Sequence, residues 1–198
     1  MKLFIVRHGE TISNVGKVIA GQSESQLTDL GKEQARLLAR RLSKHSFTHI
    51  YSSPLSRASE TTKYIGEHQS SQPVYLDQLK ERSWGCFEGR LIREYVDAAH
   101  EYGERYWEFT PPGGESLVDL QERIAPALTA LLEKHKNEKV LISAHHSVNK
   151  MLLHILLERT WEDWGAQMQG NTCVNSVEVI SGFTEVRYLN CCKHLIAL

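Results

Sequence analysis

The sequence predicts an α/β fold in which helices cover both faces of a mostly parallel sheet. Short apolar runs suited to buried strands occur at residues 2–6, 47–52, 73–76 and 139–144. Longer stretches with apolar residues at helical spacing separate them, and this alternation is typical of a parallel sheet. Two more runs, at residues 176–180 and 183–189, flank Ser181-Gly182. This two-residue hairpin signal predicts an antiparallel element near the C-terminus, so we expect a three-layer α/β/α sandwich.

The helices are predicted from apolar periodicity and from their end signals. Residues 28–42 repeat Leu and Ala at helical spacing among Arg and Lys, which is typical of an amphipathic helix. Ser53-Pro54 offers a cap followed by a proline suited to the first helical position, so the next helix should begin there and run toward Glu67. Residues 115–136 and 147–158 predict two further helices. The least regular part, residues 81–112, should hold a helix over 91–106.

The composition excludes several classes of protein. A chain of 198 residues with 41% hydrophobic content can bury one good core, so we expect one domain over residues 1–198. A net charge of -1 gives no global attraction to nucleic acid or to an anionic membrane, and neither is expected as a partner. The N-terminal residues lack the apolar core of a signal peptide, and no apolar run reaches membrane-spanning length. The four cysteines lack C-x-x-C spacing, which indicates free thiols, no metal framework and a cytoplasmic location.

Three predicted strands end in residues suited to a phosphoryl group. Arg7 and His8 follow the first strand, Ser53 and then Arg57 follow the second, and His145 follows the fourth. Ligands of open α/β sheets bind in the crevice at the carboxyl ends of the strands. If these strands are parallel neighbours, their cationic and imidazole groups share one crevice. Arginine matches phosphate with its planar fork, and histidine can act as a nucleophile or proton carrier near neutral pH.

Six sequence blocks resemble the histidine phosphatase superfamily, and they occur in that family's order. The blocks are Arg7-His8-Gly9-Glu10-Thr11 with Asn14; Leu27-Thr28 with Gly31 and Gln34-Ala35; Ser53-Pro54-Leu55-Ser56-Arg57-Ala58 with Thr61; Leu79-Lys80-Glu81 with Gly85 and Glu88-Gly89; Gly113-Gly114-Glu115-Ser116; and Ala144-His145. The family contains cofactor-dependent phosphoglycerate mutases, fructose-2,6-bisphosphatases and many small phosphatases. The resemblance implies a phosphoglycerate mutase-like fold and phosphoryl transfer with neither a metal nor a cofactor.

The resemblance also implies a role for each matching residue. His8 would be the nucleophile and form a phosphohistidine, which splits one hard transfer into two easier ones. Its other ring nitrogen should donate to a nearby carbonyl, because that bond fixes the neutral tautomer. Arg7 and Arg57 would clamp the phosphoryl oxygens in place of a metal. His145 would add a further donor, and Asn14 a neutral one.

Glu81 is the residue that the resemblance implies as proton donor to the leaving oxygen and then as base for water. A neighbouring phosphate dianion favours the protonated carboxyl that an acid catalyst needs. Glu88 is the competing carboxyl. Gly21 and Gln22 are expected to bind substrate, and the stretch 19–22 is similar to TIGAR-type fructose-2,6-bisphosphatases. His146 stands where the family usually has glycine, so it could narrow the pocket, add a cation or turn outward.

These features predict a metal-independent phosphatase for small phosphorylated metabolites that releases inorganic phosphate. Residues 82–112, which are rich in aromatic side chains and include Arg90, Arg93 and Arg105, are expected to cover the substrate. A phosphoglycerate mutase stays open, although the family's mutases carry an extra segment that this chain lacks. A catalytically inactive regulatory module on the same fold and, less favoured, a zinc hydrolase built on His145-His146 also stay open. So do the identity of the substrate and a homodimer.

Overall fold

A six-stranded mixed sheet forms the centre of the protein. The structure is a computed structural model that describes residues 1–103, 105–166, 168–180 and 182–196. The sheet order is β3-β2-β4-β1-β5-β6. The strands are β1 (Lys2–Arg7), β2 (His49–Ser52), β3 (Pro73–Tyr75), β4 (Lys139–Ala144), β5 (Val174–Ile180) and β6 (Phe183–Cys191). Strands β1 to β4 run parallel to one another. Strand β5 runs antiparallel to both of its neighbours, β1 and β6. The predicted fold class is confirmed.

The register of the parallel strands brings three chain segments to one edge of the sheet. Arg7 of β1 lies opposite Ala144 of β4, and Ser52 of β2 lies opposite Ser143 of the same strand. Strands β1 and β4 lie in the middle of the sheet and are buried on both faces, which explains their continuous apolar runs. The residues that follow these strands therefore leave the sheet side by side.

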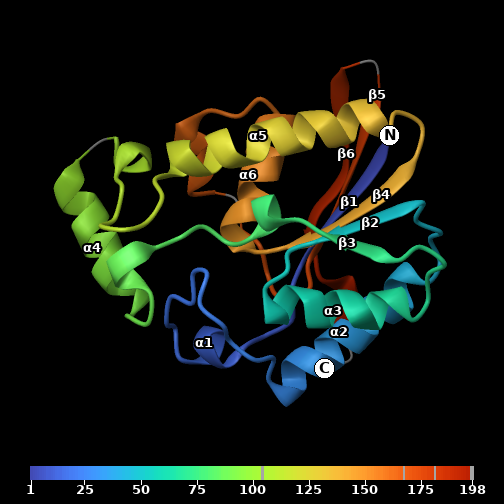
Figure 1. Ribbon diagram of the computed structural model, residues 1–198, viewed down its shortest axis with the longest axis horizontal. Helices are drawn as coiled ribbons and strands as arrows, with labels where there is room; N and C mark the ends of the chain where they lie inside the picture. Colours follow the sequence, from blue (N-terminus) through green and yellow to red (C-terminus); the bar gives the residue numbers. More distant parts are fainter. Residues whose placement is uncertain (104, 167, 181, 197–198) are drawn as a thin grey trace.

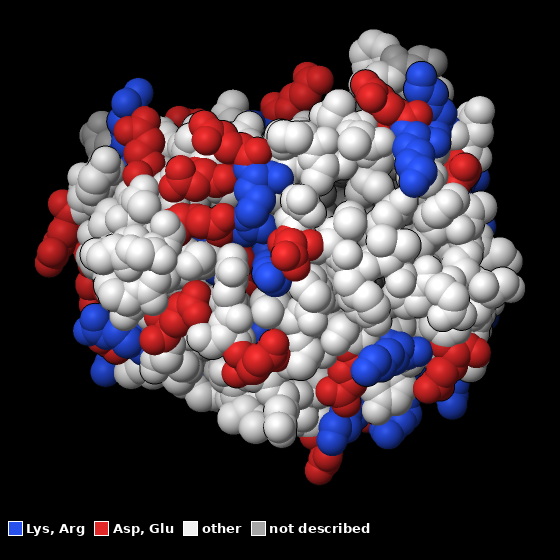
Figure 2. All heavy atoms as spheres, in the orientation of Figure 1, with Lys and Arg blue, Asp and Glu red and all other residues white. Residues whose placement is uncertain are grey.

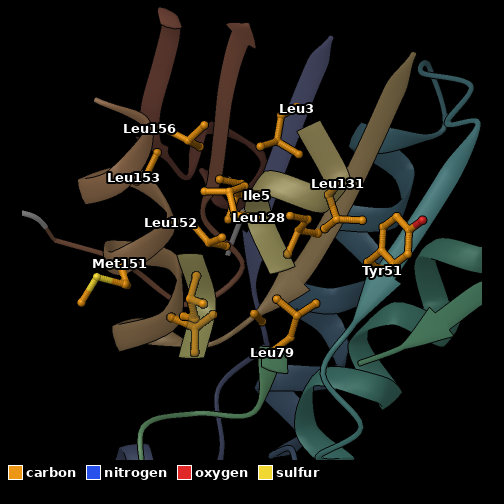
Figure 3. Packing of buried hydrophobic residues seen from close by; sticks show 14 of the residues in the cluster. Leu3, Ile5, Tyr51, Leu79, Leu128, Leu131, Met151, Leu152, Leu153 and Leu156 are labelled. Carbon is orange, nitrogen blue, oxygen red and sulfur yellow. The ribbon is translucent and has the colours of Figure 1, made fainter. Parts of the chain in front are cut away.

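Helices cover both faces of the sheet (Figure 1). On one face lie α2 (Asp29–Leu42) and α3 (Ser56–Gly66), and on the other lie α5 (Leu117–Lys134) and α6 (His146–Leu156). Alternate residues of β1 face the two layers: Leu3 and Ile5 pack with α5 and α6, whereas Phe4 and Val6 pack with α2 and α3. Figure 3 shows the first cluster, with Leu128 and Leu131 of α5 over the sheet.

Two smaller helices, α1 (Ile12–Val15) and α4 (Ile92–Tyr102), lie beyond the carboxyl ends of the parallel strands (Figure 1). The short 3-10 helices are η1 (Asp77–Leu79), η2 (Gly85–Phe87), η3 (Tyr106–Glu108), η4 (Trp161–Trp164) and η5 (Lys193–Leu195). A separate small cluster of Ile19, Phe87, Tyr95 and Ala99 packs α4 onto the loop after α1. This end of the molecule has its own core.

The predicted start of α3 is wrong. The helix begins at Ser56, and its N-cap Leu55 makes no side-chain cap bond. Ser53, the predicted cap, instead hydrogen-bonds through its Oγ to His145 Nε2 at 2.7 Å, because the parallel sheet brings the two residues together. The helix predicted over 91–106 is also too long, since α4 ends at Tyr102 and a 3-10 helix follows.

The C-terminal hairpin was predicted in the right place. Ile180 of β5 pairs with Phe183 of β6. Gly182 has a φ of 86°, a left-handed conformation that glycine adopts without steric cost. Ser181, the other predicted turn residue, lies outside the described residues.

The surface carries both signs of charge. On the face drawn in Figure 2, Lys and Arg side chains lie among Asp and Glu side chains, as the near-zero net charge leads one to expect. In the described part of the chain, no helix has the length and apolar character needed to cross a lipid bilayer.

We predict that Leu128→Ala destabilises the protein strongly. Leu128 is 2% exposed and belongs to the cluster that joins α5 to the sheet. Truncation of a buried leucine removes apolar contact and leaves a cavity, so the free energy of unfolding should fall by about 2–5 kcal/mol. Urea denaturation measures this change. The exposed neighbour Thr129→Ala is the matched control and should change stability by no more than about 0.5 kcal/mol.

Candidate active site

A cavity of about 310 Å³ opens at the carboxyl edge of the parallel strands. The wall of the cavity includes residues from the end of β1, from the segment after η1, from the start of α6 and from the segment around α4. Most of the predicted site residues lie in this wall. They are Arg7, His8, Asn14, Gly21, Arg57 and Glu81.

His8 is held in one orientation by the backbone around it. Its Nδ1 lies 2.7 Å from the carbonyl oxygen of Gly9. A carbonyl only accepts, so Nδ1 donates and Nε2 is left with a lone pair. Burial, together with the positive charges of Arg7 and Arg57, holds the pKa of His8 well below its usual value. The imidazole is therefore neutral at pH 7, in the tautomer that the sequence analysis expected.

Backbone carbonyls orient the two arginines. Arg7 Nη1 donates to the carbonyl of Gln169 at 2.6 Å, and Arg57 donates to the carbonyls of Gly21 and Ser23 at 2.6 and 2.9 Å. Burial lowers the pKa of both guanidinium groups, but arginine stays charged in proteins. Carbonyl dipoles do not neutralise these charges, so the cavity keeps two fixed cations beside His8.

His145 lies directly beside His8. The two ring centroids are 5.2 Å apart, and His145 is completely buried. Burial and the charge of Arg57 hold its pKa well below the usual value, so this imidazole is neutral too. Among the described residues, its Nδ1 is a buried atom without a hydrogen-bond partner. His145 is not among the residues that line the cavity, but its ring lies next to that of His8, which does line it.

The two candidate carboxyl groups have different surroundings. The Glu81 carboxylate reaches the cavity and accepts hydrogen bonds from the backbone N–H of Arg82 at 2.8 Å and of Ser147 at 3.2 Å. The Glu88 carboxylate accepts from Ser23 Oγ at 2.7 Å and from backbone N–H groups of the same turn, outside the cavity wall. Glu88 therefore shapes the turn at residues 21–23, and Glu81 is the carboxyl that faces the cavity.

Two hydrogen bonds fix the orientation of the Asn14 side-chain amide at the cavity. Its Oδ1 accepts from the backbone N–H of Thr11 at 3.1 Å and from Asn171 Nδ2 at 3.0 Å. These two donors fix the amide orientation and leave Nδ2 as a donor toward the cavity.

Gly21 and Gln22 differ in their positions relative to the cavity. Gly21 has a φ of 54° and lies in the cavity wall, where a Cβ would come 2.1 Å from the Glu88 carboxylate. Gln22, in contrast, donates through Nε2 to the backbone carbonyl of Glu81 at 3.1 Å and is not among the lining residues. It contacts the backbone that carries the candidate acid.

His146 turns toward the cavity. It lines the wall, with its Nδ1 3.4 Å from the carbonyl of Gln169. Burial and the charge of Arg7 lower its pKa to about 3. Of the three options that the sequence left open, the outward orientation and the added cation are therefore wrong. A neutral imidazole fills the space that a glycine would leave empty.

Sequence reasoning missed several residues of the site. The segment before β5 contributes Gln169, whose carbonyl holds Arg7, and Asn171, which donates to Asn14 and to the carbonyl of His8. The polar run 169–172 before an apolar strand was the available signal. Lys150 also lines the cavity from α6. Its spacing of four residues from His146 places both on one helix face.

A group of potential metal ligands lies at the other end of the sheet. The ligand atoms of His49, His135 and Glu138 lie within 4.8 Å of one another. His49 opens β2, so this group lies at the amino ends of the parallel strands. Both imidazoles contact the Glu138 carboxylate, at 2.7 and 3.0 Å. A metal bound there would not contact the cavity at the carboxyl ends.

The fold and the site define an α/β enzyme of the phosphoryl-transfer class. Residues 3–192 match the histidine phosphatase superfamily (branch 1), and the chain belongs to this family. It is 36% identical over 161 residues to phosphoglycerate mutase-like protein 4 of Arabidopsis thaliana, which covers 76% of this chain and 69% of that protein.

Solved structures of phosphatases share the whole fold. The α-ribazole phosphatase of Shigella flexneri superimposes with a TM-score of 0.87 at 26% identity, over 97% of each chain. The mycobacterial glucosyl-3-phosphoglycerate phosphatase in complex with VO3 does so with a TM-score of 0.85 at 28% identity, over 96% of this chain and 98% of that one. The predicted family is confirmed.

We predict that the protein loses stability as the pH falls below 6.5, and that His146→Gln reduces this loss. His146 has a lower pKa in the folded state than when unfolded, so below pH 6.5 the unfolded chain binds more protons. Between pH 6.5 and pH 5 this residue alone should lower the free energy of unfolding by about 2 kcal/mol. Urea denaturation at several pH values, in a buffer without phosphate, measures the slope. An identical slope in the variant would contradict the prediction.

Proposed function

We propose that this protein is a metal-independent phosphatase that hydrolyses small phosphorylated metabolites through a phosphohistidine on His8. The observation that carries the proposal is the neutral, buried imidazole of His8. The bond to Gly9 leaves its Nε2 lone pair free, and the positive charges of Arg7 and Arg57 act on it. The likeness to solved phosphatases over almost the entire chain supports hydrolysis.

In the first step, His8 Nε2 attacks phosphorus while the bond from phosphorus to the ester oxygen breaks. Arg7 and Arg57 stabilise the charge on the phosphoryl oxygens, the task that a metal ion performs in many phosphotransferases. Because backbone carbonyls already orient both guanidinium groups, little rearrangement is needed when the substrate arrives. Preorganisation of this kind is where most electrostatic stabilisation of transition states originates.

His145 and Asn14 would add neutral donors to the phosphoryl group. The backbone N–H of Leu55 donates to Ser53 Oγ, so that hydroxyl can donate its own proton to His145 Nε2. This arrangement leaves the proton of His145 on Nδ1, the buried atom that has no partner in the described structure. Asn14 offers Nδ2, since Thr11 and Asn171 occupy its oxygen.

Glu81 would move the proton in both steps. As an acid it protonates the leaving oxygen of the substrate. As a carboxylate it then takes a proton from water, whose oxygen attacks phosphorus and breaks the bond to His8, releasing inorganic phosphate. The contact of Glu81 with the N-terminal turn of α6 keeps the carboxyl facing the cavity between the two steps.

The segment 82–112 would cover the bound substrate as part of one domain spanning residues 1–198. Arg82, Trp84, Ile92, Tyr95 and Tyr106 from this segment line the cavity.

The arginines expected on this segment do not all serve the cavity. Arg90 pairs with Glu94 and Arg105 pairs with Glu108, and both pairs lie at the surface. The aromatic side chains and Arg82 are therefore better placed than these arginines to select the substrate.

The four free cysteines support a reducing, cytoplasmic location.

A phosphoglycerate mutase is the second candidate, because the Arabidopsis relative is named phosphoglycerate mutase-like. A mutase would convert 3-phosphoglycerate to 2-phosphoglycerate in the presence of 2,3-bisphosphoglycerate, and phosphate release without isomerisation would exclude it. An inactive regulatory module would release phosphate from no phosphoester.

We predict that the protein hydrolyses p-nitrophenyl phosphate in EDTA, that vanadate inhibits it, and that His8→Ala lowers kcat by at least about a thousandfold. Removal of the imidazole removes the attacking nitrogen, and the fold should persist. Rates of p-nitrophenolate release and circular dichroism spectra measure both effects. Exchange of the exposed His68 for alanine is the matched control and should retain full activity. A wild-type rate in His8→Ala would exclude the nucleophile assignment.

We predict that Glu81→Gln costs more with an alkyl phosphate than with p-nitrophenyl phosphate. An alkoxide needs a proton to leave, whereas p-nitrophenolate does not, so the loss in kcat should be about 100-fold or more for the first and much smaller for the second. Steady-state rates on both substrates give the two ratios. Glu88→Gln serves as the comparison, since its contacts are to the turn and any loss should be similar for both substrates. Equal losses in Glu81→Gln would assign the donor role to another residue.

A further inference from the structure

Lys150 is a buried cation that the proposed reaction does not use. It lies on α6, one turn after His146, and lines the cavity while being only 6% exposed. Its Nζ lies 4.5 Å from the centre of the Trp164 ring, on the wall that α6 and η4 build together. Within residues 1–103, 105–166, 168–180 and 182–196, no hydrogen bond or ion pair engages this ammonium group.

The other charged groups of the cavity have partners. Arg7 and Arg57 donate to backbone carbonyls, and Arg82 Nε donates to the carbonyl of Glu115 at 2.7 Å. The Glu81 carboxylate is occupied by backbone N–H groups. Among the described residues, Lys150 is therefore the lining cation without a hydrogen-bond partner, although the charge of the Glu81 carboxylate also acts on it. An ammonium group removed from water without a hydrogen-bond acceptor is unfavourable.

The charge on Lys150 persists near neutral pH. Burial lowers the pKa of Lys150 to about 8, so most Lys150 side chains are protonated at pH 7. An anionic group supplied by a ligand would both pair with this charge and restore its hydrogen bonds. The phosphoryl group at His8 already has Arg7, Arg57 and His145 as proposed partners, which leaves Lys150 for a different group of the same molecule.

We infer that the substrate is a small phosphomonoester that carries a second anionic group, a carboxylate or another phosphate, and that Lys150 binds this group. The inference rests on the proposed function, since it assumes that the transferred phosphoryl group lies at His8. A cavity of about 310 Å³ is at the small end for ligand sites and admits a compact molecule. Trp84, Tyr95 and Leu117 supply apolar surface in the cavity wall.

Matched pairs of substrates test the inference. The pair 3-phosphoglycerate and glycerol 3-phosphate differs by a carboxylate, and the pair fructose 1,6-bisphosphate and fructose 6-phosphate differs by a phosphate. For at least one pair, kcat/KM should be about tenfold or more higher for the member with two anionic groups, because a charge-assisted hydrogen bond has this strength. In Lys150→Met the ratio within that pair should fall to about one, through KM. The pair that responds identifies the anion.

Two further variants keep the test decisive. Lys150→Gln retains a polar side chain without the charge, and it replaces Lys150→Met in the test if the Met variant folds poorly. It should lose the substrate preference in the same way. Lys134→Met, at an exposed position of α5, is the control and should retain the wild-type ratio. A ratio near one in the wild-type protein for both pairs, or an unchanged ratio in both Lys150 variants, would overturn the inference.

Binding to His8→Ala separates this inference from the proposed function. Isothermal titration of the two pairs into this variant needs no turnover. Discrimination in binding without any hydrolysis by the wild-type protein would reject the phosphatase and retain the second-anion site. Hydrolysis of both members of each pair, with one and with two anionic groups, at equal kcat/KM would reject the second-anion site alone.

Discussion

Parallel pairing of β1 with β4, and of β4 with β2, is the constraint on which the site depends. Because the three strands run in the same direction, their carboxyl ends meet at one edge, and the chain leaves that edge at His8, Ser53 and His145. The ladder continues just past the strands, since the N–H of His8 donates to the carbonyl of Ala144 and that of Ser53 donates to the carbonyl of Ser143. His8 and Ser53 are thus fixed to the sheet by backbone hydrogen bonds.

The electrostatic character of the cavity follows from how its cations are held. In many proteins a buried arginine is paired with a carboxylate, which cancels its charge. Here the main partners of Arg7 and Arg57 are carbonyl oxygens, which orient the guanidinium groups without neutralising them. The histidines stay neutral in this field, as the lowered pKa of His8 shows. The charge of the Glu81 carboxylate only partly offsets these two cations, so the pocket suits a doubly charged phosphoryl group.

Much of the fold could be predicted because its signals are local. The apolar runs of β1 and β4 and the periodicity of α2 depend on neighbouring residues only, and the motif around His8 is contiguous. The errors occurred where a distant residue changes a local preference. The helix begins at Ser56 and not after Ser53, whose hydroxyl bonds to His145, 92 residues away. Asn171 and Lys150 were not predicted because a polar run before a strand and a lysine on a helix are common features, and only the folded chain brings Asn171 to Asn14 and Lys150 to the cavity.

The turn at residues 21–23 connects groups with opposite tasks. Its carbonyls accept hydrogen bonds from the guanidinium of Arg57, and the Gln22 amide donates to the backbone carbonyl of Glu81. The Glu88 carboxylate accepts hydrogen bonds from the backbone N–H groups of the turn. Any displacement of the segment that carries Glu81 and Glu88 is transmitted to Arg57 through this turn. The cation proposed to bind phosphate and the carboxyl group proposed as the acid are therefore held through one short turn, so that a substitution which distorts this turn should disturb both groups together.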